Sequence, residues 1–144
     1  MNQLLIPMFL QVLLTFGILF ASGFLRYRSV GKRTVNPKDY VLMTGQDQWP
    51  VLIQKLGRSF HNQLEVPLLF YVWTLMTLLT GIESQILLYM AWAYVGLRYV
   101  HAFIHIGYNN VLHRFSVFLI SCLLLLSMWF ILFSNAMETG WLRF

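Results

Sequence analysis

The short stretch RSFHNQLEVP contains side chains that could form a binding site at the start of an apolar segment. It holds a cation, an imidazole, an amide and a carboxylate, namely Arg58, His61, Asn62 and Glu65. On a helix with 3.6 residues per turn, their spacing of i, i+3, i+4 and i+7 places them on one face. Ionisable side chains inside a membrane segment are rare and mark functional sites or paired networks. The stretch therefore predicts either a ligand site or a polar network that joins helices.

A second polar stripe follows later in the chain. Arg98, His101 and His105 stand at i, i+3 and i+7, and the sequence places them at the same depth as the first set. Arg114 opens the last apolar run, where a helix N-terminus and a guanidinium would both attract an anion. No carboxylate stands near Arg114 in the sequence, so we expect this residue to face a ligand.

The signs of these charges indicate the kind of ligand. One carboxylate, Glu65, faces at least three arginines, and Arg26 and Arg28 stand just above them. An isolated ion at the centre of a bilayer costs roughly 2.5 to 3.5 kcal/mol, so such a set is expected to be paired or used. Uncompensated arginines favour carboxylates or phosphates. The predicted ligand is therefore anionic overall with one positive end, unless Glu65 only holds an arginine in place.

The composition indicates that these residues lie in a small membrane protein. Of the 144 residues, 58% are hydrophobic and 10% are charged, against roughly 25% charged in an average soluble domain. The net charge of +5 is concentrated near one connection, which favours a positive-inside bias over binding to nucleic acid. The single Cys122 excludes an internal disulfide and is expected to be a small packing residue.

Hydropathy and charge predict a single all-α domain, a bundle of four transmembrane helices. The uncharged Met1–Leu25 would reach about 37 Å, enough to cross a hydrocarbon core of about 30 Å. It has no basic residue before its apolar core, so we do not read it as a cleaved signal peptide. The basic exit RYRSVGKR places that end in the cytoplasm, with the N-terminus and the tail Glu138–Phe144 outside. The predicted spans are about 4–26, 57–81, 85–107 and 115–136.

Two further features are expected of the connections. A cytoplasmic loop at about 27–56 is interrupted by Gly and Pro, and we expect it to be partly ordered against the membrane surface. Its apolar anchors at that surface would be Tyr40, Trp49, Val51, Leu52 and Ile53. Pro67 is expected to kink the second helix, which begins near Val51 or Leu56 and ends near Thr80. Gly81–Ser84 is short enough only for an antiparallel outer turn.

The order of these motifs resembles a known family. Arg58-x3-Asn62-x2-Glu65 is followed by Pro67, then by Arg98-x2-His101, and Arg114 opens the last span. This order is similar to that of the membrane-associated proteins in eicosanoid and glutathione metabolism, the MAPEG superfamily. The resemblance covers the second to fourth helices in order and spacing, whereas the first helix matches only in type, with its basic exit.

The resemblance implies a homotrimer with ligand clefts between neighbouring subunits that face the cytoplasm. In members that bind glutathione, the counterparts of Arg58, Asn62 and Glu65 hold the charged ends of the tripeptide. A basic residue at the end of the first helix, here Arg28 or Arg26, adds to that clamp. The counterpart of Arg114 is the catalytic residue that stabilises the thiolate, as a nearby guanidinium lowers a thiol pKa. The other expected binding residues are His61, Arg98, His101 and His105.

The chain also departs from the family pattern. Many members that use glutathione have Tyr at the position of His105, and Phe115 replaces a polar residue after the arginine. The segment IHIGYNNVLHRF resembles bacterial relatives without an established reaction, which implies a bacterial inner membrane. His105 can replace the Tyr as a hydrogen-bond donor, or the pocket can bind another molecule.

Several functions remain open on this basis. One hypothesis is a glutathione-dependent transferase or peroxidase that acts on lipophilic electrophiles from the bilayer. The alternative is a non-catalytic lipid-binding or scaffold protein of the same fold, in which Arg58, Asn62, Glu65 and Arg98 only tie helices together. A transporter is disfavoured because four spans offer no pair of discontinuous helices. His101 and His105 could chelate a metal, but the arginines would repel it, so we predict no metal site.

Overall fold

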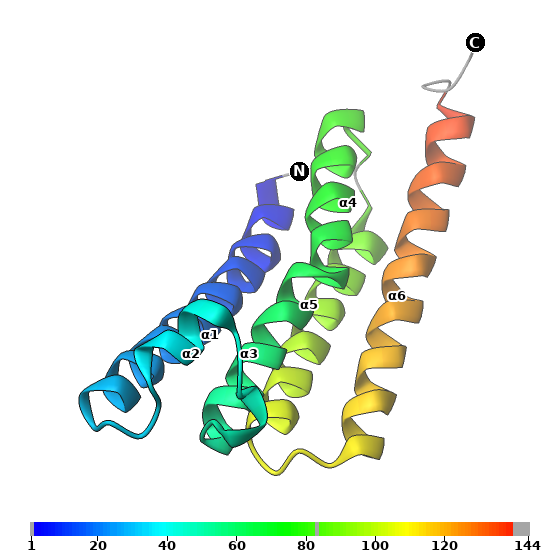
Figure 1. Ribbon diagram of the computed structural model, residues 1–144. Coiled ribbons are helices and arrows are strands. Elements are labelled where there is room, and N and C mark those ends of the chain that lie inside the picture. The colour runs from blue at the N-terminus through cyan, green and yellow to red at the C-terminus, as the bar shows by residue number, and fades with distance from the viewer. Residues whose placement is uncertain (1, 83, 140–144) are drawn as a thin grey trace.

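Six α-helices make up most of this computed structural model, which describes residues 2–82 and 84–139 (Figure 1). Short 3-10 turns occupy Asn2–Leu4 and Gln46–Gln48, and no strand occurs within the described ranges. The prediction of an all-helical chain is confirmed. The helices are α1 (Leu5–Gly31), α2 (Pro37–Leu42), α3 (Val51–Leu64), α4 (Val66–Thr80), α5 (Gln85–Ile106) and α6 (Val111–Glu138).

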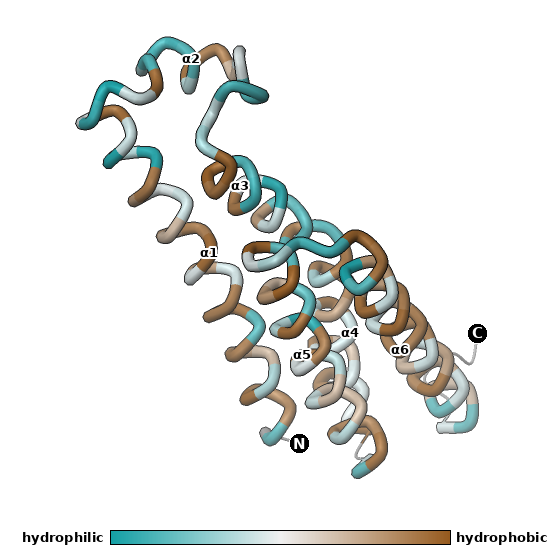
Figure 2. Tube along the Cα trace, turned by 90° about the horizontal axis from the view of Figure 1, so that it is seen from below, coloured by the Kyte–Doolittle hydropathy of each residue, from teal (hydrophilic) through white to brown (hydrophobic). Residues whose placement is uncertain are grey.

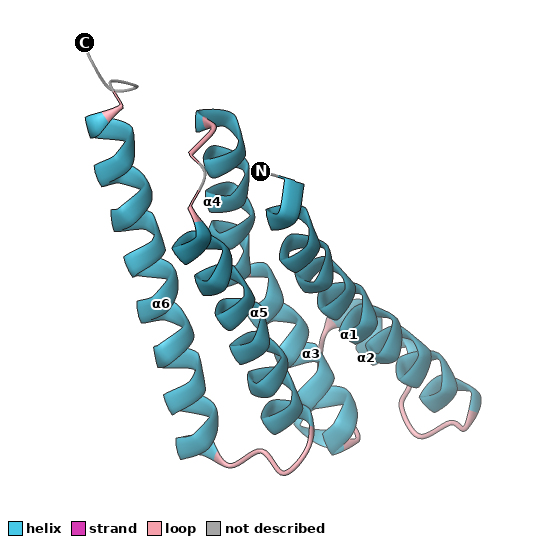
Figure 3. Cartoon of the chain, turned by 180° about the vertical axis from the view of Figure 1, so that it is seen from behind, coloured by secondary structure: helices cyan, strands magenta, loops and turns pink. Residues whose placement is uncertain are grey.

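The long helices lie side by side in an antiparallel bundle. α5 packs most extensively against α6, and α1 contacts α3, α4 and α5. The connection 32–50 and the turn between α5 and α6 lie at one end, which we call the basic end (Figures 1 and 3). Hydrophilic residues gather there on the connection and along α3 (Figure 2). The opposite end holds the start of α1 and the turn that begins at Gly81. Gly81 has a φ of 66°, in the left-handed region that favours glycine. Glu83 and the predicted outer tail from Gly140 onward lie outside the described residues.

Within the part of the chain that the structure describes, three helical stretches are long and apolar enough to cross a membrane. They are Leu5–Gly31, Val51–Thr80 and Val111–Glu138. α5 has 22 residues and so extends about 33 Å, a sufficient length for a bilayer core of about 30 Å. Its polar residues Arg98, His101 and His105 lower its hydropathy, and all three are buried against other helices. The fourth span remains a prediction.

The predicted second helix is interrupted rather than kinked. α3 ends at Leu64, and Glu65 has φ −89° and ψ −95°, which is outside the helical region. α4 then begins with Pro67 in its first turn. Proline has no N–H and its ring clashes with the carbonyl four residues earlier, so it starts a helix more readily than it continues one. The predicted disturbance near Pro67 is therefore present, as a one-residue break at Glu65 within the helical stretch Val51–Thr80.

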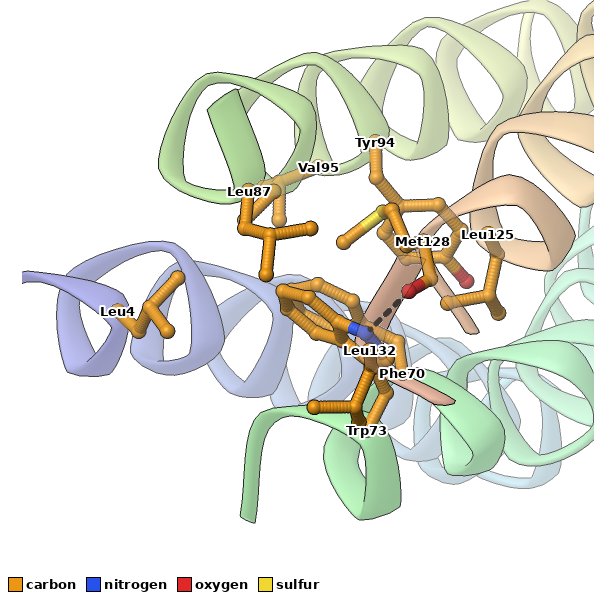
Figure 4. Packing of buried hydrophobic residues seen from close by; sticks show 10 residues of the cluster. Leu4, Phe70, Trp73, Leu87, Tyr94, Val95, Leu125, Met128 and Leu132 are labelled. Carbon is orange, nitrogen blue, oxygen red and sulfur yellow. Dashed lines mark hydrogen bonds between the residues drawn. The ribbon is translucent and has the colours of Figure 1, made fainter. Parts of the chain in front are cut away.

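A core of aromatic and aliphatic side chains joins α4, α5 and α6 (Figure 4). The indole N–H of Trp73 donates to the backbone oxygen of Met128 at 3.0 Å. The ring of Phe70 stacks on Tyr94 with 4.6 Å between centroids. All four residues are fully buried. This packing fixes the rotation of α5, and with it the direction of the polar side chains about one to three turns further along.

Substituting Trp73 by Phe tests this core. We expect a loss of about 1–2 kcal/mol in the free energy of unfolding, because the hydrogen bond to Met128 and part of the ring volume disappear. Unfolding in mixed detergent micelles measures it. Trp92→Phe is the matched control, because Trp92 lies in α5 with an exposed side chain. Equal stability of the two variants would contradict the assigned role of Trp73.

The connection 32–50 folds against the protein, whereas the sequence predicted a longer loop at 27–56. Trp49 and Ile53 are only 6% and 3% exposed and pack with Val35 between the ends of α1 and α3. The ring of Tyr40 packs against Trp49 in a tilted arrangement, with 4.6 Å between ring centroids. The prediction that Trp49 and Ile53 anchor the loop to the membrane surface was wrong, because they fill a small core of their own. Leu52 stays exposed.

Candidate functional site

The predicted polar face of α3 divides into two directions. Arg58, His61 and Glu65 are exposed, whereas Asn62 is half-buried and points toward α5. Successive residues of a helix are about 100° apart, so Asn62 can leave the side that His61 occupies. Glu65 also lies in the break after α3, where the helical spacing no longer applies.

Arg98 forms the polar link between α3 and α5. Its side chain is 0% exposed, and Nη2 donates to the backbone oxygen of Asn62 at 2.9 Å and to Oδ1 at 2.5 Å. The ring of Phe118 lies 5.8 Å from the guanidinium carbon. Within residues 2–82 and 84–139, no ion pair joins Arg98 to Glu65. A polar contact does connect these helices, but the amide of Asn62 rather than the carboxylate of Glu65 binds Arg98.

The two histidines of α5 face α6. His101 and His105 are buried with their ring centroids 5.9 Å apart. His101 Nδ1 lies 3.2 Å from the backbone oxygen of Arg114. His101 Nε2 and His105 Nδ1 are buried without a hydrogen-bond partner in the described part of the chain. Both histidines line the cavity described below.

The turn before α6 orients Arg114. Asn110 caps α6, since its Oδ1 accepts hydrogen bonds from the backbone N–H groups of Leu112 and His113 at 3.0 and 3.1 Å. Asn109, with φ 52°, accepts from Arg114 Nη1 at 2.8 Å. The role of Asn109 was not foreseen. The signal was the pair Asn109-Asn110, because Asn both tolerates positive φ and caps helices.

Arg114, the histidines and Asn62 line one cavity, which we call the Arg114 cavity. Its volume is about 300 Å³. Half of its lining residues are polar, and the other half are aliphatic or aromatic residues that sequence reasoning did not assign to a site. The lining residues are Asn62, His101, His105, Val111, Leu112, Arg114, Phe115 and Phe118.

A second cavity, the Arg26 cavity, lies between α1, the connection and α3. Its volume is about 450 Å³, and Arg26, Arg58 and His61 line it together with Asp47. The guanidinium carbon of Arg26 lies 5.7 Å from the ring centroids of both Tyr40 and Trp49, a distance typical of cation–π contacts.

The structure thus distinguishes the two cations at the end of α1. A Cβ added at Gly57 would lie 3.4 Å from Arg26 Nη2, so Arg26 rests against α3. Arg28 does not line the Arg26 cavity and instead lies in another pocket with Lys32.

Both cavities can hold anionic groups, and α3 contributes to both. The predicted site residues divide between these two cavities, except Glu65 and Arg98, which line neither, and Arg28, which lies in another pocket. Among the described residues, no group of three or more His, Cys, Asp or Glu side chains is arranged to hold a metal ion. The arrangement favours binding of an anion beside an apolar surface.

Comparison with known proteins identifies the family. A sequence model of the MAPEG family matches residues 4–134, a range that begins before α1 and ends within the last turns of α6. No curated protein gives a significant match, and no solved structure does so either. Of the described helical stretches that can cross a membrane, the match includes the first two completely and the third up to residue 134. The chain therefore belongs to the MAPEG family and is an integral membrane protein.

Proposed function

We propose that this protein is a glutathione-dependent transferase or peroxidase that acts on lipophilic electrophiles. The observation that supports it is the position of Arg114. Arg114 is half-buried, its guanidinium donates to Asn109 at 2.8 Å, and it lines a cavity formed by both polar and apolar side chains. The family is generally related to glutathione. Such a site suits a thiolate next to an apolar substrate.

The charges at the basic end match those of glutathione. Glutathione has two carboxylates and one ammonium group. Arg26 and Arg58 line one cavity and would bind the carboxylates, because a guanidinium forms paired hydrogen bonds with them. Glu65 follows Arg58 by seven residues, is exposed, and would bind the ammonium group. His61 would add a further polar contact. We assign the helix-one contribution to Arg26, since Arg28 lies in a separate pocket.

Four residues of the Arg114 cavity would have distinct roles. Bound glutathione supplies the thiol that serves as nucleophile. The positive charge of Arg114 would favour the thiolate form, and the limited access of water strengthens that interaction. His105, with its unpaired Nδ1, would serve as hydrogen-bond donor in the position where many relatives have Tyr. Leu112 and Phe115 are exposed beside Arg114 and would admit a substrate laterally from the lipid.

We further propose a homotrimer of four-span subunits with the basic end in the cytoplasm of a bacterial inner membrane. The cations at this end support that orientation under the positive-inside rule. α5 would be the fourth span, since its polar side chains are turned into the bundle. Arg58, His61 and Glu65 are exposed in the single subunit. Their exposure supports the proposal that a neighbouring subunit completes the cleft. Membrane lipids would cover the remaining apolar surface.

Calorimetry in detergent tests the choice of ligand. The parent protein should bind glutathione at millimolar concentration or below. Arg58→Gln should weaken binding about 10- to 100-fold, because a hydrogen bond between charged groups is lost. Arg33→Gln is the control, since it removes the same charge from an exposed residue of the connection. No heat of binding by the parent protein would reject the proposal and favour a non-catalytic, lipid-binding member of the family.

A further inference from the structure

A third pocket lies at the basic end, between the last turns of α1 and the first turn of α3. Its volume is about 280 Å³. Four aliphatic residues, two cations and two residues with hydroxyl groups line it. The lining residues are Leu25, Arg28, Ser29, Lys32, Thr34, Pro50, Leu52 and Ile53.

Arg28 and Lys32 are the groups of this pocket that remain available to a ligand. They are four residues apart at the end of α1, so both lie on one side of it. Both are exposed, and neither side chain makes a hydrogen bond or ion pair within the described ranges. The hydroxyls are already used, because Ser29 donates to the backbone oxygen of Arg26 at 2.7 Å and Thr34 to that of Ser29 at 3.0 Å.

This pocket is distinct from the cavities assigned to glutathione. It shares only Ile53 with the Arg26 cavity and no residue with the Arg114 cavity. Arg26 does not line this pocket and instead contacts the rings of Tyr40 and Trp49. A ligand here would therefore meet two positive charges and no carboxylate among the lining residues.

The position of the pocket along α1 indicates its depth in the membrane. α1 carries no charged residue before Arg26, so Leu25 lies where the hydrocarbon core ends and the headgroup layer begins. Leu52, 45% exposed, provides apolar surface from the start of α3. A cation pair at headgroup depth above an aliphatic wall matches the two parts of a phospholipid.

We propose that this pocket binds an acidic glycerophospholipid. Arg28 and Lys32 would hold the phosphate of the headgroup, and Leu25 and Leu52 would contact the upper part of an acyl chain. The excess of positive charge selects an anionic lipid over a zwitterionic one. The site is independent of the proposed enzymatic function.

Native mass spectrometry of the full chain tests this site, with glutathione absent from every sample. The protein is titrated with dioleoylphosphatidylglycerol or dioleoylphosphatidylcholine. The acidic lipid should be retained about tenfold more tightly, and Arg28→Gln with Lys32→Gln should remove that preference. The control is the double variant Arg33→Gln with Lys38→Gln, which also removes two positive charges but from residues outside the pocket. This control should preserve the preference for the acidic lipid. Equal retention of both lipids by the parent, or equal loss in both double variants, would overturn the proposal.

A second variant and a second ligand separate a lipid from free phosphate. Leu52→Asn should lower retention of the acidic lipid several-fold, since its side chain contacts the chain region and is exposed enough to tolerate the change. Inorganic phosphate should bind far more weakly than the lipid and equally to the parent and Leu52→Asn. If inorganic phosphate binds as tightly as the lipid, the apolar wall contributes nothing and the lipid assignment fails.

Discussion

Arg114→Ala is expected to lower the rate of thiol transfer by about 10²- to 10³-fold. In the proposed mechanism the guanidinium is the group that stabilises the developing thiolate, and removal of one preorganised charge donor typically costs that much. Binding of glutathione should fall much less, because Arg26 and Arg58 lie in a different cavity from Arg114. The loss should therefore appear in kcat rather than in KM for glutathione.

The thiolate itself provides a direct measurement. Glutathione bound to the parent protein should show the ultraviolet absorbance of a thiolate, and Arg114→Ala should abolish it. Asn109→Ala should give an intermediate loss, because it removes the hydrogen bond that orients Arg114 at 2.8 Å. Arg33→Gln removes a charge far from the cavity and should leave the signal unchanged. Persistence of the thiolate signal in Arg114→Ala would refute the role of Arg114.

Asn62→Ala is expected to destabilise the fold by about 2–4 kcal/mol. Arg98 is completely buried and has only Asn62 as hydrogen-bond partner in the described part of the chain. Removing the amide leaves a buried charge with a single backbone acceptor, and a buried charge that loses its partner is strongly destabilising. Chemical unfolding in mixed micelles measures the effect.

Two further variants show whether the pair itself is responsible. Replacing both partners, with Asn62→Leu and Arg98→Met, should recover most of the lost stability, because no unpaired charge remains in the bundle. Asn135→Ala is the matched amide control, since Asn135 donates only within its own helix to Ile131 at 2.8 Å. It should cost less than about 1 kcal/mol. If Asn62→Ala is no more destabilising than Asn135→Ala, Arg98 does not depend on this contact.

The helical class and the family were predictable from sequence. Apolar length and the position of charges are local properties, and they identified the helices that contain Arg58, Arg98 and Arg114. The break at Glu65 was only partly predictable. Pro67 signalled a disturbance, but its exact position depends on which backbone groups the neighbouring helices can satisfy.

Contacts between helices decided the remaining features of the site. The rotation of each helix about its axis decides which side chains meet. It determines that Asn62 faces Arg98, and that Arg26 rather than Arg28 lies in the same cavity as Arg58. That rotation is set by distant packing, such as Trp73 against Met128 and Phe70 against Tyr94. Trp49 likewise left its predicted place at the membrane surface for a small core with Val35 and Ile53.

The amino-acid sequence by itself determined that this chain is helical, inserts into a membrane and gathers its cations at one end, because these properties depend on residue type and spacing. Only the tertiary structure decided that the polar residues of RSFHNQLEVP serve different purposes. Asn62 turns inward to hold Arg98, while Arg58 and His61 line the Arg26 cavity. The physical reason is that a helical pattern defines neighbours on one face, whereas burial of that face depends on the helices that pack against it.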